Sequence, residues 1–201
     1  MKKKKRGIIS RSNFLRGSPA AWNYIKESKN FIFAIIIIFF IFALIGFFVP
    51  APEIISNSIL SFLQNLLEKT QDMSRYELID FIFFNNLQSC FFGFLFGFFL
   101  GIFPIVIAIL NGYVLGFVGK LAVEKGGISV LWSLLPHGIF ELPAIFISLG
   151  IGLKFGTFIF QKEIGKSFKD YFFNGLKVFI LVVILLLIIA AIIEGNLMRI
   201  F

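Results

Sequence analysis

The long apolar runs of this chain constrain its fold more than any other feature. Phe31 to Val49 is a run of 19 almost entirely hydrophobic residues, and as a helix it is about 28 Å long, enough to cross the hydrocarbon core of a bilayer. Phe81 to Leu110 and Leu176 to Ile193 are similarly apolar. Because the lipid interior offers the backbone no hydrogen-bond partners, these runs predict an all-α, polytopic transmembrane helix bundle.

The composition favours one membrane-embedded domain and excludes an ordinary soluble one. Of 201 residues, 58% are hydrophobic and only 15% are charged. We therefore treat residues 1–30 as a basic N-terminal segment and residues 31–201 as a single transmembrane helical domain. The single cysteine, Cys90, excludes an intrachain disulfide and a multi-thiol metal site.

The charged residues are distributed in a way that predicts orientation. Residues 1–29 carry nine Lys or Arg against one acid, and residues 154–177 carry five Lys against two acids, whereas residues 50–80 carry two basic residues against five acids. Cytoplasmic segments of membrane proteins are rich in Lys and Arg. We therefore expect residues 1–30 and a basic loop at 154–177 to be cytoplasmic and residues 50–80 to be external. The +8 net charge then reflects orientation and attraction to anionic lipid in the plasma membrane, and we expect no nucleic-acid partner.

The positions of the two basic segments fix the parity of the crossings. Both are expected to be cytoplasmic, so an even number of crossings separates them. The clearly apolar runs between them supply an odd number, so one further crossing is needed within residues 101–135. We expect it to start at Pro104 or Gly112, with an external turn at 124–127. Residues 128–135 are then a short re-entrant or surface segment. The chain as a whole has about five spans, and its C-terminus is external.

The run from Phe81 to Leu110 is longer than one perpendicular crossing requires, and it contains Pro104. Two interpretations remain open. It is either one long kinked helix that ends at Asn111 and Gly112, or two segments broken between Gly101 and Pro104.

Apolar residues recur at helical spacing within the external segment 50–80 and predict an amphipathic helix over residues 54–67. Its apolar residues are either a cover for the outer end of the bundle or a docking surface for a partner protein. The candidates for docking are Ile55, Ile59, Phe62, Leu63 and Leu66.

Small residues and prolines predict close helix packing and local helix breaks. Gly93, Gly97 and Gly101 fall at every fourth position, a spacing that lets another helix approach closely. Gly112 and Gly116 repeat the pattern. These faces also allow self-association. Pro136 suits the first turn of a helix, and Pro143 leaves a backbone carbonyl without its helical partner.

Ionisable and amide side chains within the apolar runs are the candidates for a functional site. His137, the single histidine, and Glu141 are four residues apart, so they share one helix face. The predicted topology places them at the same outer depth as Glu194. We assign the following residues to one polar cluster: His137, Glu141, Glu194, Asn85, Asn86 and Asn111.

Three interpretations of this cluster compete. It is a buried hydrogen-bonded network that fixes helix register, a transport site for a proton, a cation or a polar solute, or the metal site of an intramembrane hydrolase. The hydrolase is the least favoured, because a catalytic zinc usually needs three protein ligands and this chain has one histidine. We expect no catalytic residues, no metal and no cofactor.

Several motifs together resemble the stage II sporulation protein M family. They are WNYIKESKN before the first span, NGYVLGFVGK at Asn111 to Lys120, LPHGIFELPA at Leu135 to Ala144 and AAIIEG at Ala190 to Gly195. The resemblance covers nearly the whole chain and implies a protein of about five spans. In endospore formers it implies a membrane scaffold for peptidoglycan-degrading partners, the D and P proteins of the same stage. Relatives also occur in organisms that make no spores.

The sequence thus predicts a non-enzymatic scaffold or assembly factor for membrane or envelope remodelling, embedded in lipid and engaging a membrane or envelope partner. The alternative is a transporter or channel-like protein that uses the His137 and Glu141 cluster.

Overall fold

The computed structural model describes residues 17–197, and for residues 17, 18, 131–139 and 197 it describes the backbone alone. This part of the chain consists of helices and short connections, with no strand among the described residues. The elements are α1 (Gly17–Glu27), α2 (Lys29–Phe48), α3 (Glu53–Thr70), α4 (Arg75–Leu95), η2 (Phe96–Phe98), α5 (Ile102–Gly126), η3 (Ile128–Val130), α6 (Leu131–Gly156), η4 (Thr157–Phe160), α7 (Ile164–Val178), η5 (Phe179–Val183) and α8 (Ile184–Leu197). The predicted all-α class is confirmed.

Five helical stretches of the described chain are long and apolar enough to cross a membrane. The last of them has 33 residues, or about 50 Å of helix, which exceeds the ~30 Å hydrocarbon core. Its first part, α7, is amphipathic and projects beyond the bundle. The five stretches are Lys29–Phe48, Arg75–Phe98, Ile102–Gly126, Phe140–Phe160 and Ile164–Asn196.

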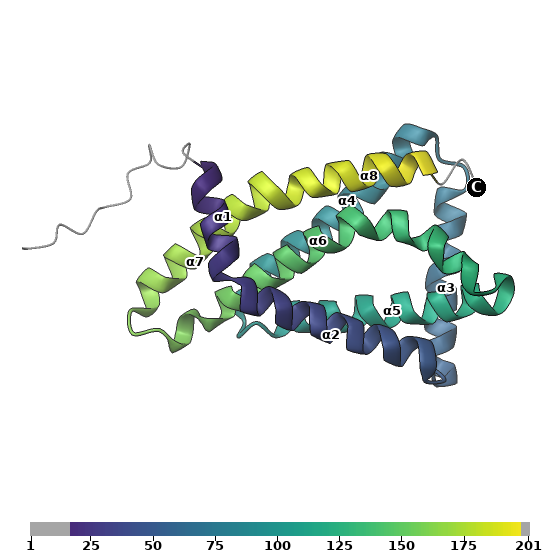
Figure 1. Cartoon of the computed structure of the whole chain (residues 1–201), viewed down its shortest axis with the longest axis horizontal. Helices are drawn as coiled ribbons and strands as arrows, with labels where there is room; N and C mark the ends of the chain where they lie inside the picture. The colour runs from purple at the N-terminus through teal and green to yellow at the C-terminus, as the bar shows by residue number, and fades with distance from the viewer. Residues whose placement is uncertain (1–16, 198–201) are drawn as a thin grey trace, which may run out of the picture.

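Figure 1 shows two pairs of helices with α6 between them. α2 packs with α5, α4 packs with α8, and α6 contacts all four. α3 crosses one end of this bundle, and α1 and α7 lie at the opposite end (Figure 1). The chain thus enters the bundle at one end and α8 finishes at the other, as an odd number of crossings requires.

Glycines lie where the helices approach most closely. A Cβ atom on Gly116 of α5 would overlap the carbonyl oxygen of Ala43 on α2, and a Cβ on Gly97 would overlap the carbonyl oxygen of Gly152 on α6. The remaining glycines of the predicted packing faces are in similar contact, Gly93 with Leu149, Gly101 with Leu153 and Gly112 with Phe39. Backbone thus packs on backbone at Gly97, Gly112 and Gly116, whereas Gly93 and Gly101 lie against leucine side chains, and both kinds of contact are typical of membrane helix pairs.

The chain reverses direction between α4 and α5 at Leu100 and Gly101. Both residues have positive φ angles, 57° and 71°, a region that costs a non-glycine residue roughly 1 kcal/mol. The run therefore breaks near Gly101, and the alternative end at Asn111 is wrong because α5 continues to Gly126. Pro104 lies in the first turn of α5, where its missing N–H has no helical acceptor to lose.

The predicted re-entrant or surface segment at 128–135 is not separate from the following span. A 3₁₀ turn at Ile128–Val130 leads directly into α6, which continues to Gly156. Figure 1 shows that α6 is bent. Pro136 and Pro143 both lie in its first half, and proline is the usual cause of a bend because it removes a helical hydrogen bond.

Candidate functional site

Three residues of the predicted polar cluster come from three helices that pack on one another. Glu141 is on α6, Asn86 on α4 and Glu194 on α8, and the Asn86 and Glu194 side chains lie close enough to Glu141 to act on its charge. All three are half-buried. The structure therefore brings two carboxyl groups and one amide together between α4, α6 and α8.

Two other predicted members lie elsewhere. Asn85 is exposed on the outward face of α4, because neighbouring residues on a helix point about 100° apart and Asn86 faces inward. Asn111 is exposed on α5, where its amide donates a hydrogen bond of 2.8 Å to the Ile107 carbonyl of its own helix. The His137 side chain lies outside the described residues.

A buried hydrogen bond joins α4 and α6 beside this cluster. The Ser148 hydroxyl donates to the Cys90 carbonyl oxygen at 2.7 Å, and both residues are at most 1% exposed. The arrangement fixes the register of two helices. Among the described residues, no group of three His, Cys, Asp or Glu side chains could hold a metal ion.

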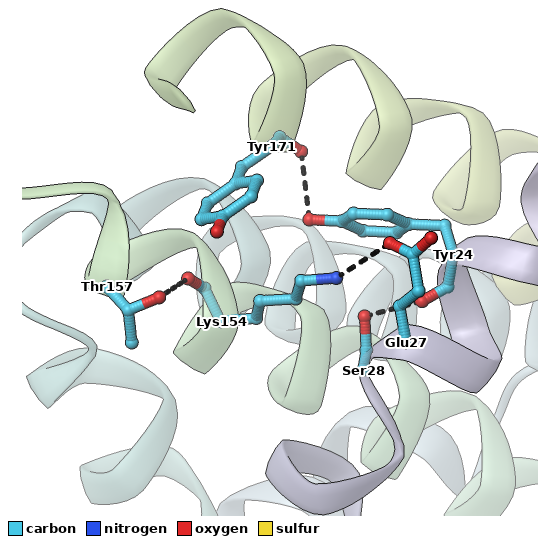
Figure 2. Close-up of polar contacts among 6 residues, drawn as sticks. All are labelled: Tyr24, Glu27, Ser28, Lys154, Thr157 and Tyr171. Carbon is cyan, nitrogen blue, oxygen red and sulfur yellow. Dashed lines mark hydrogen bonds and ion pairs between the residues drawn. The ribbon is translucent and has the colours of Figure 1, made fainter. Parts of the chain in front are cut away.

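A second polar site lies at the opposite end of the bundle, around Lys154 near the end of α6 (Figure 2). Lys154 is 6% exposed. Its Nζ lies 3.9 Å from the centroid of the Tyr24 ring and 5.5 Å from that of Tyr171, and 3.5 Å from Oε2 of Glu27. Lys154, which the charge pattern placed at the start of a basic loop, is therefore packed inside near the end of α6.

The aromatic rings offset part of the cost of burying this ammonium group. A cation over a desolvated ring is stabilised by about 2 kcal/mol, and the Glu27 carboxylate, itself 68% exposed, supplies the opposite charge. Hydrogen bonds fix the surrounding groups. The Tyr24 hydroxyl donates to the Tyr171 carbonyl oxygen at 3.4 Å, and the buried Ser28 hydroxyl donates to the Tyr24 carbonyl oxygen at 2.6 Å.

Tyr24 is held in its neutral form by this environment. Burial raises the pKa of its phenol well above the usual value, and the nearby Tyr171, Glu27 and Asp170 raise it further. A neutral Tyr24 next to the Lys154 ammonium and the Glu27 carboxylate makes the site a closed structural contact between α1, α6 and α7. Because its phenol stays neutral, Tyr24 adds no negative charge next to the Lys154 ammonium.

The family model described as stage II sporulation protein M matches residues 35–198. The chain belongs to this family. The matched residues include most of the first span and all of the other four. They therefore include Glu141, Glu194 and Lys154. α1 precedes them, so Tyr24 and Glu27 lie outside the matched part.

The match to one relative is similarly extensive. An uncharacterized protein of Methanocaldococcus jannaschii is 29% identical over 175 residues, which cover 84% of this chain and 78% of that protein. No solved structure matches the chain. Family membership and the five apolar helices together make this an integral membrane protein.

The Lys154 site was not predicted from the sequence. Lys154 follows the apolar stretch SLGIGL at the end of a span, which is where the positive-inside rule expects a solvated lysine. The available signal was weak: Lys154 is followed by further apolar residues rather than by polar ones. Only the packing of α1 and α7 over the end of α6 reveals that the lysine is buried.

Proposed function

We propose that this protein is a non-enzymatic scaffold or assembly factor of the membrane, and that α3 carries its docking surface for a protein partner. The observation that supports this most is the position of α3. It lies across one end of the bundle rather than beside the spans (Figure 1). In the proposed orientation, with the basic N-terminal segment (residues 1–30) and α7 in the cytoplasm, α3 is external.

The apolar surface of α3 is wider than the part that packs on the bundle. Ile59 is 8% exposed and faces inward, with Leu63 and Leu66 partly buried beside it. On the two flanks of this strip, Phe62 is 54% exposed and Leu67 is 68% exposed. Of the residues predicted to dock a partner, Ile59 is buried, Leu63 and Leu66 are half-buried, and Ile55 and Phe62 are exposed.

Accessible aromatic and aliphatic side chains beside a polar rim are the usual composition of a protein interface. Here the rim consists of the Ser, Asn, Gln and Glu residues on the opposite side of α3. We infer that the partner covers the Phe62 and Leu67 flanks at the external membrane surface. This assigns envelope or membrane assembly, rather than chemistry, to the exposed end of the protein.

The proposal is tested by co-purification from native membranes. Phe62→Ser combined with Leu67→Ser should remove a partner without lowering expression, because neither side chain is buried. Ser61→Ala on the polar side of the same helix is the matched control and should leave the partner bound. Unchanged recovery of the partner with the double variant would place the docking surface elsewhere.

A second candidate function is transport, and one observation favours it. Glu141 and Glu194 lie close together in the membrane domain, which is costly and often marks an ion or proton pathway. Glu141→Gln should then abolish a pH-dependent flux in liposomes containing the purified protein. Flux equal to that of the unaltered protein would remove the transport proposal and leave the cluster as a structural network.

A further inference from the structure

The outward face of α4 differs from the outward faces of α2 and α8. Asn85 and Gln88 are both exposed on it, and they lie near the middle of the Arg75–Phe98 span. The depth is supported by the neighbouring helix, since Cys90 is bonded to Ser148, which lies in the middle part of the Phe140–Phe160 span. Two amide side chains therefore lie on the outward face within the length of this span.

An amide in hydrocarbon has no hydrogen-bond partner, and leaving it so costs a few kcal/mol per group. The outward faces of α2 and α8 avoid this cost, because their exposed residues are apolar. Examples are Phe33, Ile37 and Leu44 on α2 and Leu185 and Ile188 on α8. The amides on α4 carry this cost, and a second helix with polar side chains in the membrane would remove it by supplying hydrogen-bond partners.

The spacing on α4 matches that of a helix-packing seam. Phe81, Asn85, Gln88 and Phe92 follow one another at intervals of four, three and four residues, which is the repeat by which two helices pack side by side in a coiled coil. One or two polar residues within such a seam fix the register and the number of strands. Phe92 is 44% exposed, so the apolar part of the seam is accessible as well.

We propose that the outward face of α4, comprising Phe81, Asn85, Gln88 and Phe92, is the interface of a homodimer in the membrane. All copies insert with the same orientation, so a two-fold axis along the membrane normal sets two α4 helices parallel, with identical residues at equal depth. An amide both donates and accepts hydrogen bonds. Each Asn85 and Gln88 therefore finds a complementary group in the second copy.

The outer end of the same face carries both signs of charge. Lys69, Glu77 and Asp80 line an open groove together with Phe81, Asn85 and Gln88. The groove therefore offers a second copy one basic and two acidic side chains, which complement that copy's own Lys69, Glu77 and Asp80. A second copy of this chain therefore fits the charges as well as the amides. This homodimer does not depend on the docking proposed for α3.

The dimer is tested by disulfide crosslinking of the full chain in native membranes. In a Cys90→Ser background, Phe92→Cys leaves both amides in place, and Leu185→Cys on the exposed side of α8 is the matched control. A disulfide forms only when the two Cα atoms come within about 7 Å. We expect a band of twice the chain mass with Phe92→Cys and none with Leu185→Cys. Equal crosslinking at both positions, none at either, or an adduct with a different protein would overturn the homodimer.

A second measurement isolates the amides. Asn85→Leu combined with Gln88→Leu removes the two polar groups without touching the buried core, so folding should persist. In vesicles of phosphatidylethanolamine and phosphatidylglycerol, single-molecule photobleaching should then show association weakened by about tenfold or more, since interhelical hydrogen bonds in membranes contribute roughly 0.6–2 kcal/mol each. Dimerisation equal to that of the unaltered chain would contradict the amide interface.

Discussion

The ammonium group of Lys154 lies 3.9 Å from the centroid of the Tyr24 ring, and this contact joins α6 to α1. It connects a helix that crosses the membrane to a helix that precedes the first span. Tyr24 is 4% exposed and Lys154 is 6% exposed, so the contact is part of the packed interior at that end of the bundle. It shows how α1 is fixed against α6 and α7.

We expect a measurable coupling between these two residues. Tyr24→Leu removes the ring and should destabilise the protein by about 2 kcal/mol, the usual strength of a desolvated cation–π contact. Tyr24→Phe keeps the ring and should cost less, because the hydroxyl makes only a long hydrogen bond of 3.4 Å. Thermal unfolding in detergent measures both changes. In a Lys154→Met background the difference between the two variants should shrink, whereas an undiminished difference would show that the ring packs without regard to the charge.

The raised pKa of Tyr24 predicts a loss of stability in alkaline solution. Its folded-state pKa lies above the value of about 10 expected in the unfolded chain. The neutral phenol therefore contributes stability that is fully present below pH 10, begins to be lost above that value, and continues to fall up to the folded-state pKa, because the unfolded chain ionises first. Unfolding of the unaltered protein and of Tyr24→Phe between pH 8 and 11.5 should show the steeper decline in the unaltered protein. Parallel curves would contradict the assignment.

Gly97 should be intolerant of even a methyl group. A Cβ at this position overlaps the Gly152 carbonyl oxygen, so Gly97→Ala must separate the two helices and should cost roughly 1–3 kcal/mol. Gly165→Ala is the control, because nothing lies within 4 Å of its Cβ position, and alanine in a helix is favoured by about 0.5–1 kcal/mol. Equal unfolding temperatures for the two variants would show that the crossing of η2 and α6 does not depend on glycine.

The buried hydrogen bond of Ser148 should contribute modestly. Ser148→Ala removes the donor to the Cys90 carbonyl and should lower the free energy of unfolding by about 0.6 kcal/mol, the average for interhelical hydrogen bonds in membranes. Ser58→Ala removes a comparable bond of 2.8 Å within the exposed α3 and should change stability less. A larger effect at Ser58 would reverse the assigned roles.

The fold was largely predictable because its elements follow from long apolar runs. The span at Phe31 to Val49 could be read directly from its length, and the parity of the basic segments required a crossing that proved to be α5. The break at Gly101 was one of two alternatives, since only the positive φ angles of Leu100 and Gly101 decide where a continuous apolar run turns.

The polar sites were less predictable because they depend on how each helix is rotated. Asn85 and Asn86 are adjacent in sequence, and nothing in the sequence distinguishes the one that faces Glu141 from the one that faces outward. Lys154 was missed for a related reason. A lysine at the end of a span is usually solvated, and its burial depends on Tyr24, which lies 130 residues earlier in the chain.

The most direct test of the proposed scaffold is photo-crosslinking from α3 in native membranes. A photoreactive amino acid at Phe62, which is 54% exposed, should yield one discrete protein adduct, and the same group at Ser61 on the polar side should yield much less. Adducts identified by mass spectrometry would then name the partner. Labelling of lipid alone from Phe62 would contradict the account, because it would show that the exposed residues of α3 rest on the membrane and dock no protein.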